Sequence, residues 1–296
     1  MSVVAATGGY HIVKPPQYVE EYVYSTIPAA ASMSWIGIVD GFSPTADMKP
    51  IEFRKVGSED LTAQVKGPEE YTVAIDYSIQ NTNFLKYGMQ AQGGGTQTPD
   101  NSLTLLTSLR LNNVENYILA LGSRVHSIKV TGKVGEGHKV SAEIYSAEIT
   151  SASTGLGVTP VYTSDPGTTP WVFSDGGTAP VQVGALAAIG LPATEIDVTV
   201  TRNLERIWTL GGTKVQYLPA KHREIKGSFT LVWTSSDPYV DLKDFNTQSM
   251  RWIMKSSSSI ELGNVNYTKL DSFTLKPTEV VYEKYSFTAR TLSVSG

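Results

Sequence analysis

The residues best suited to metal binding or acid–base chemistry are widely separated in this sequence. None of the four histidines, His11, His126, His138 and His222, has a second ligand at a spacing such as HExxH. His138 and His222 lie near predicted turns, so we expect them to be solvated. The absence of cysteine excludes disulfides, thiolate zinc sites, iron–sulfur clusters and thiol catalysis. We therefore expect no metal site and no cofactor.

Paired carboxylates, which glycosidases use, occur as two adjacent pairs, Glu20 with Glu21 and Glu69 with Glu70. Adjacent residues on a strand point to opposite faces, so neither pair can flank one glycosidic bond. The five tryptophans could form a sugar platform, although a core or interface role is favoured. Residues 266–268 match a glycosylation acceptor, but no secretion signal accompanies them. We expect no catalytic residue and no enzymatic activity.

The composition is that of a folded, mildly acidic protein. The chain has 296 residues, a formal net charge of −4 and 41% hydrophobic residues, which excludes global disorder. A pI of about 5.6 without a run of Lys or Arg argues against a basic nucleic-acid-binding surface. The most apolar stretch, Pro180 to Ala193, is broken by Gly and Pro and falls short of the ~20 residues that span a bilayer. We expect no membrane insertion.

Most segments alternate apolar and polar residues with a period of two, which indicates half-buried β-strands. In Thr72 to Ile79, for example, Val73, Ile75 and Tyr77 share one face. The glycine-rich segment Gly132 to Gly137 predicts a hairpin turn. The same alternation predicts strands in Leu103 to Leu111, Val125 to Val130, His138 to Ile149, Ile196 to Val200, Gly227 to Trp233 and Tyr282 to Val294.

Two short helices are expected. One begins at Asp237, which can cap the first turn, and continues through Pro238 with Tyr239, Leu242 and Phe245 at three-residue spacing. The other covers Thr82 to Tyr87. We expect each helix to cover a sheet edge or face.

The two helices occupy equivalent places in an internal repeat. A shift of 154 residues places Gly57 on Gly211 and Ile75 on Phe229, and the alternation stays in phase up to the helix starts. We therefore predict a mainly β fold of tandem duplicated modules, each with a short flanking helix. The predicted segments are an N-terminal arm (1–36), a first module (37–150), a loop or linker (151–189) and a second module (190–296).

The order of short motifs resembles that of the major tail tube proteins of long-tailed viruses of bacteria and archaea. The likeness runs from Gly37 to the C-terminus without the loop at 151–180. Its specificity lies in the order of the motifs, since each one is short. They are GIVDGFSP from Gly37, RKVGSED from Arg54, VKGPEEYTV from Val65, QNTNFLKYG from Gln80, LGSRVHSIKV from Leu121, GEGHKVSAE from Gly135, TVTRNLE from Thr199 and REIKGSFT from Arg223.

This resemblance implies a β-sandwich or barrel-like module that joins others in rings of six modules, stacked into a hollow tube for DNA passage. A duplicated chain would close the ring as a trimer with pseudo-sixfold symmetry, whereas a single module would need six copies. The partners implied are further copies, the tail terminator, the baseplate or tip, the tape measure protein and, transiently, genomic DNA. The location implied is the virion tail, after assembly in the host cytoplasm.

The resemblance also implies loops that reach the adjacent ring, here Ser43 to Gly67 and Asp197 to Lys221. Candidates for acids that face the lumen are Asp76, Glu143 and Glu148, since an acidic lining would repel DNA phosphate. The candidate inter-ring residues are Thr45, Asp47, Lys49, Glu52, Arg54, Glu59, Arg202, Glu205, Arg206 and Lys214.

Three other functions fit the same sequence pattern. One is the inner tube of a contractile injection or tail-like particle, and the second is a carbohydrate-binding or carbohydrate-cleaving β-sandwich. The third is a capsid or head decoration jelly roll, which would assemble on a shell.

Overall fold

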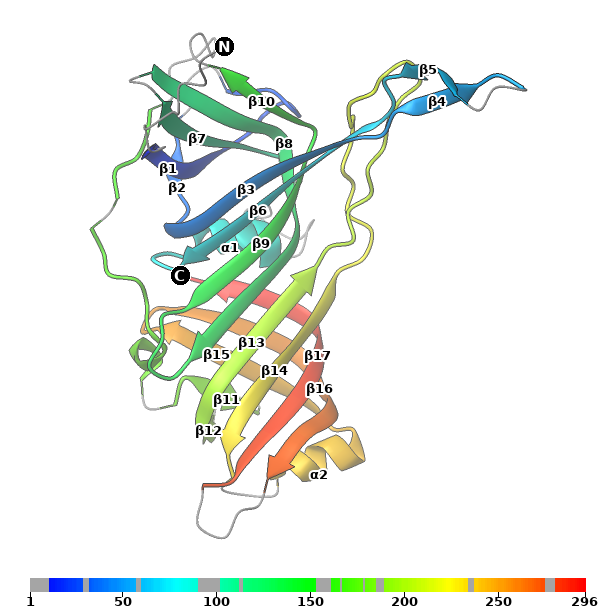
Figure 1. Cartoon of the computed structure of the whole chain (residues 1–296). Helices are drawn as coiled ribbons and strands as arrows, with labels where there is room; N and C mark the ends of the chain where they lie inside the picture. The colour runs from blue at the N-terminus through cyan, green and yellow to red at the C-terminus, as the bar shows by residue number, and fades with distance from the viewer. Residues whose placement is uncertain are drawn as a thin grey trace.

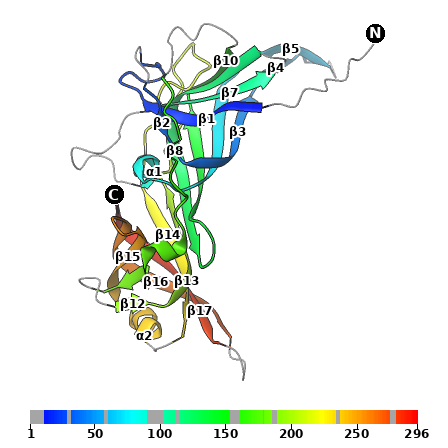
Figure 2. The ribbon, with the colours of Figure 1, turned by 90° about the vertical axis from the view of Figure 1, so that its left-hand side faces the viewer.

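The computed structural model confirms a mainly β fold with two short α-helices (Figure 1). Almost every strand belongs to one connected antiparallel network, which also forms the long axis of the molecule (Figures 1 and 2). The structure describes residues 11–28, 32–56, 60–89, 102–111, 114–152, 161–165, 167–177, 179–184, 189–233, 237–274 and 280–296.

The first module has the strand order β3-β6-β9-β8-β7, with α1 packed against β8. Every pairing is antiparallel, and residues such as Ile75 and Ala142 lie opposite each other on the buried face. The predicted hairpin turn between β8 and β9 is confirmed. The elements are β3 (Ile38–Met48), β6 (Glu69–Ser78), α1 (Asn83–Met89), β7 (Leu103–Leu111), β8 (Val114–Lys133) and β9 (Lys139–Ser146).

The second module repeats this order as β13-β14-β17-β16-β15. The first residues of α1 and α2, Asn83 and Asp237, are 154 residues apart, as the repeat predicts. Even the bulges agree, since β3 shifts register after Val39 and β13 after Ala193. The elements are β13 (Ala193–Thr201), β14 (Glu224–Val232), α2 (Asp237–Asp244), β15 (Thr247–Lys255), β16 (Ser258–Thr274) and β17 (Tyr282–Ser295). The two modules therefore share one topology.

The modules are fused by direct strand pairing between β8 and β13. Val130 lies opposite Val198, and both are fully buried. The result is one large twisted sheet in the order β3-β6-β9-β8-β13-β14-β17-β16-β15 (Figure 1). Two short strands extend its far end, β11 (Val181–Val183) and β12 (Ile189–Leu191). The sheet runs through both modules without a break, so it does not mark where one predicted segment ends and the next begins. The limits of the four segments therefore stay a prediction.

Strand β8 serves two sheets. Its first half pairs with β7 and β10, and its second half pairs with β9 and β13. The change occurs near Gly122, whose φ of +60° favours glycine. The Gly122 N–H donates to the buried Glu21 carboxylate at 2.9 Å. The smaller sheet is completed by β1 (His11–Glu20), β2 (Ser34–Trp35) and β10 (Glu148–Ala152).

One continuous core runs under both modules, and the linker is anchored to it. Phe84 and Leu85 of α1 are buried, as are Phe229 of β14 and Tyr285 of β17. The connecting segment contributes buried Trp171 and Phe173, which lies in the short 3-10 helix η1 (Phe173–Gly176). The two modules therefore share their apolar interior.

The prediction that His138 is solvated is wrong, whereas His222 is exposed as expected. The ring of His138 is 0% exposed and lies 5.4 Å from Trp252 and 6.1 Å from Phe173. Its backbone N–H donates to Trp171 O, so the linker covers the turn on which His138 lies. Within the described residues neither ring nitrogen has a hydrogen-bond partner. Burial lowers the pKa of His138 to about 4, and the nearby backbone groups of Met254 and Val172, with the Asp175 carboxylate, offset only part of this.

We predict that His138 makes the protein less stable in mild acid. The unfolded chain binds a proton near pH 6.5, whereas native His138 does so only near pH 4, so stability is complete above pH 6.5 and falls below it. Between pH 7 and pH 5 the loss is roughly 2 kcal/mol. Urea unfolding of wild type and His138→Phe at both pH values measures it. The variant should lose this part of the pH dependence, and His222→Gln should keep it. An unchanged pH dependence in His138→Phe would contradict the assignment.

Candidate assembly surfaces

The connection between β3 and β6 forms a hairpin that extends beyond the body of the molecule (Figure 1). We call residues 49–68 the first arm; it contains β4 (Ile51–Arg54) and β5 (Leu61–Val65). Ile51, Phe53, Val56 and Val65 all expose about half or more of their surface. A lone two-stranded hairpin is marginally stable in water, so an apolar one of this kind suits a surface that packs against a partner.

The equivalent connection between β13 and β14 forms a second arm, residues 202–223. It is an irregular hairpin with bridges from Leu204 to Ala220 and from Ile207 to Tyr217. Its tip carries Leu210, which is fully exposed and precedes Gly211 at a φ of +85°. The repeat places Leu210 on Val56, which is also fully exposed. Each arm therefore presents an aliphatic side chain at the same place.

The second arm packs against the first module through Arg206 and, near its tip, through Thr213. Arg206 lies 3.7 Å from the centre of the Tyr145 ring, which stacks on His126, and its guanidinium contacts Glu70 at 3.3 Å. The Glu69 N–H donates to Thr213 O, and Thr213 Oγ1 donates to the Glu69 carboxylate at 2.6 Å.

Glu69 is the most strongly held acid in this contact. Burial opposes its ionisation, but hydrogen bonds from Lys66, Thr213 and Tyr71 outweigh it and lower the pKa of Glu69 to about 2. The carboxylate is therefore charged at neutral pH and ties the second arm to β6.

Several of the predicted inter-ring residues make contacts within the chain. Arg202 is buried and donates from Nε to Gly88 O at 3.2 Å, which places it under the β8–β13 junction. Lys214 pairs with Glu148 at 2.6 Å, and Lys49 pairs with Glu70. With Arg206, these residues position the arms, so we leave all four out of the inter-ring set that we propose below.

The other predicted inter-ring residues are exposed where they are described. Thr45 and Asp47 lie on the outermost strand, β3, and Glu52 and Arg54 lie on the first arm as a pair at 3.6 Å. Glu205 of the second arm pairs with Lys221 at 3.0 Å. Glu59 lies outside the described residues. The predicted set does not include the exposed Val56 and Leu210, although both are aliphatic residues that precede a glycine in a polar loop.

The large sheet has one buried face and one polar face. Register pairs place side chains on the same face, and Asp76 lies opposite Ser141 while Glu143 lies opposite Ser127. Two predicted lumen acids, Asp76 and Glu143, are therefore on the polar sheet face. Glu148 is on β10 in the smaller sheet and pairs with Lys214, so it lies elsewhere. The polar sheet face also carries Lys129, Asp197, Thr199, Lys226, Ser228, Lys269, Asp271, Lys284 and Ser286.

Acids neutralise much of the positive charge on the polar sheet face. Lys129 lies 3.7 Å from Asp197, and Lys269 lies 2.8 Å from Asp271. Hydrogen bonds from Lys269 and Ser286 lower the pKa of Asp271, which keeps it ionised at neutral pH. The face is therefore hydrophilic and mixed in charge, and the lysines are not gathered into a basic groove.

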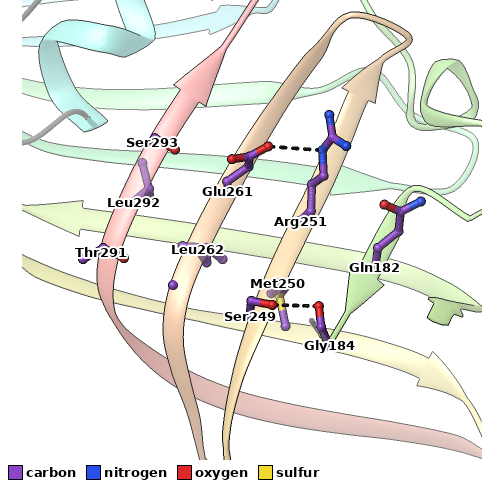
Figure 3. Close-up of a pocket in the computed structure, with 11 residues that line it drawn as sticks. Gln182, Gly184, Ser249, Met250, Arg251, Glu261, Leu262, Thr291, Leu292 and Ser293 are labelled. Carbon is purple, nitrogen blue, oxygen red and sulfur yellow. Dashed lines mark hydrogen bonds and ion pairs between the residues drawn. The ribbon is translucent and has the colours of Figure 1, made fainter. Parts of the chain in front are cut away.

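A shallow groove crosses β11, β15, β16 and β17 (Figure 3). Its polar groups bind one another: Arg251 lies 3.4 Å from Glu261, and the Ser249 hydroxyl donates to the backbone carbonyl of Gly184 at 2.7 Å. These contacts tie neighbouring strands together. Among the described residues, no group of His, Asp and Glu is suited to hold a metal ion.

The tryptophans do not form a shared surface platform. Trp171 and Trp252 are buried in the core, and Trp35 and Trp208 donate from their indole nitrogens to Gln80 and to Glu69 O. Of the five tryptophans, Trp233 alone exposes a large part of its side chain, 48% of its surface.

We predict that Glu69→Ala releases the second arm without unfolding the sheet. The variant loses the bonds from Lys66, Thr213 and Tyr71 and leaves the buried Tyr71 hydroxyl and the half-buried Thr213 hydroxyl without this acceptor, which costs about 1–3 kcal/mol. Hydrogen exchange should then be faster at the N–H of position 69, which donates to Thr213 O, and at the Ile207 N–H, and unchanged at Val130. Glu52→Ala, on the exposed first arm, is the matched control. Equal protection of the second arm in both variants would contradict the assigned role of Glu69.

Comparison with known proteins agrees with this architecture. No curated protein gave a significant match. In the part of the chain that the structure describes, the helices are too short or too polar to cross a membrane. The family model described as phage tail tube protein matches residues 17–289, nearly the whole chain. The chain therefore belongs to the phage tail tube protein family, whose members are structural components of the virion tail.

Proposed function

We propose that three copies of this chain form one ring of a hollow tail tube through which the phage genome passes. The observation that carries this proposal is the pairing of two modules of the same topology through β8 and β13. Each chain then supplies two of the six modules, and the tube is assembled in the host cytoplasm. The ends of the tube would meet the tail terminator and the baseplate or tip, with the tape measure protein inside.

The outer strands of the sheet support ring formation. Among the described strands, β6 is the one partner of β3, so the other edge of β3 is open. An open β edge is a template for another chain, and closing the sheet into a ring satisfies it. A ring built by head-to-tail contacts closes when the rotation that relates neighbouring modules is a whole-number fraction of 360°.

The polar sheet face supports the lumen assignment. Its opposite face is sealed by the core and α1, so only the polar face is available to line a channel. Asp76 and Glu143 would repel DNA phosphate, and the lysines of this face lie among acids. DNA would therefore slide through without the tight binding that a basic surface provides through counterion release.

The two arms support axial stacking. We propose that Val56 and Leu210, with Glu52, Arg54 and Glu205 beside them, contact the next ring. In the trimer, three first arms and three second arms would provide six contacts of the same kind around the ring.

We predict that Val56→Asp with Leu210→Asp abolishes tubes and leaves folded rings or protomers. Both side chains are fully exposed in the single chain, so the substitutions should leave its unfolding free energy within about 0.5 kcal/mol of wild type. Urea unfolding measures the stability, and negative-stain microscopy across a concentration series measures the assembly. Wild type should form hollow tubes, and Val134→Asp, an exposed position at the β8–β9 turn, should do the same. Normal tubes from the double variant would contradict the stacking role, and a wild type without tubes would contradict the proposed function.

A further inference from the structure

The β8–β13 junction joins the two modules within the chain. The equivalent strands, β16 of the second module and β3 of the first, are not joined to each other. In the first module the second half of β8 pairs with β9 on one side and with β13 on the other. In the second module the equivalent half of β16, from Tyr267 onward, pairs with β17, but β15 ends its pairing with β16 at Asn266. The place that β13 fills beside β8 is therefore empty beside β16, among the described residues. The strand equivalent to β13 is β3, and no other described strand pairs with its outer edge.

We infer that β3 of one chain pairs antiparallel with residues 267–274 of β16 of a second copy, in the register of the β8–β13 junction. This inference rests on the proposed function, because it names the contact that joins chains within the ring.

The ladders of the two modules determine the register. The β8–β9 ladder can be superimposed on the β16–β17 ladder. Lys269 is then equivalent to Ser127, Ser272 to Lys129 and Phe273 to Val130. Matching β3–β6 to β13–β14 places Asp47 on Thr201, Thr45 on Thr199 and Pro44 on Val198. In the internal junction Ser127 lies opposite Thr201, Lys129 opposite Thr199 and Val130 opposite Val198. Across chains, Lys269 should therefore lie opposite Asp47, Ser272 opposite Thr45 and Phe273 opposite Pro44.

The charges at these positions are complementary. Lys269 and Asp47 are on the polar sheet face, and both are exposed. Lys269 already contacts Asp271 within its own strand, so it would bridge two acids after pairing. The internal junction has a similar contact across its strands, between Lys129 and Asp197 at 3.7 Å.

The apolar side of the open junction is exposed where its counterpart is buried. Phe273 is 43% exposed and Val130 is 0% exposed, although they are equivalent. Trp233 is 48% exposed, against 0% for Ile79 in the first module. Phe273 and Trp233 contact each other edge to face at 6.5 Å. A strand placed beside β16 would cover this pair as β13 covers Val130.

Helix α2 shows the same difference from α1. Tyr239 of α2 is 51% exposed, whereas the equivalent Leu85 of α1 is 0% exposed. The end of α1 is held by the second module, since Arg202 and Arg223 donate to Gly88 O and Met89 O. The repeat places Met48 on Arg202. A neighbouring β3 would therefore bring the exposed Met48 over α2, and apolar contact would replace these two hydrogen bonds.

Cross-linking tests the register, because the chain has no cysteine of its own. Residues opposite each other in an antiparallel pair have Cα atoms about 4.5 or 5.5 Å apart, and a disulfide spans both distances. Assembled Asp47→Cys/Lys269→Cys should give covalent dimers and trimers after mild oxidation. Asp47→Cys/Lys284→Cys is the matched control, because Lys284 is one strand further in, on β17, and should give only monomers.

Charge reversal tests the same contact without covalent chemistry. Asp47→Lys and Lys269→Asp should each weaken assembly about two- to fivefold per junction, and the double variant should recover it. Both residues are exposed, so Asp47→Lys should leave the unfolding midpoint of the isolated chain unchanged, and Lys269→Asp, which also loses the surface pair with Asp271, should lower it only slightly.

The outcomes separate the inference from the proposed function. Tubes that form without the Asp47–Lys269 cross-link would overturn this register and leave the tube intact. A wild type that stays monomeric at every concentration would overturn both.

Discussion

The antiparallel ladder between β8 and β13 is the contact on which the rest of the structure depends. It joins two modules of identical strand order, and its central residues Val130 and Val198 are fully buried. Without it the second half of β8 and the facing side of β13 would each present an open edge. With it, the polar residues of both modules lie on one surface, and both arms extend from corresponding places in the repeat. Side-chain contacts reinforce the ladder, since Lys129 pairs with Asp197 across it and Arg202 ties β13 to α1 below it.

Strand β8 can pair with β13 because it leaves the smaller sheet at Gly122. A positive φ at this position and the hydrogen bond to buried Glu21 turn the strand from one sheet to the other. Any side chain here would also collide with Ala147, whose Cβ would lie 2.7 Å from the added carbon. The hydroxyls of Ser102 and Thr104 and the Ser25 N–H also donate to Glu21, which compensates the cost of burying its carboxylate. The bend thus frees the second half of β8 for the junction.

Much of the fold could be predicted from the sequence because its signals are local. Alternation located the strands around Ile75, Phe229 and Tyr285, and a fixed shift aligned the two helix starts. Pairing between distant strands has no local signal, so the fusion of the modules through β8 and β13 was not predicted. The same reason explains the wrong expectation for His138, which is covered by a linker segment more than 30 residues away.

The candidate site was predictable only in outline. The loops that became the arms were located, but charge and loop position cannot distinguish an exposed arginine from one that is held within the chain. Arg206 stacks on Tyr145, and Arg202 is buried under the junction, so neither is free for a partner. Whether a predicted lumen acid can face a channel depends on which face of the sheet is buried. Alternation separates two faces without saying which one packs on the core, and the burial of Val73, Ile75 and Tyr77 decides it.

The most direct test of this account is a cryo-electron microscopy reconstruction of the assembled tube, with the number of chains per ring and the strand pairing read from the map. The account predicts three chains and six junctions per ring, in which β8–β13 pairs within a chain alternate with β16–β3 pairs between chains. Six chains per ring, or a tube in which the outer edge of β3 stays unpaired, would contradict it.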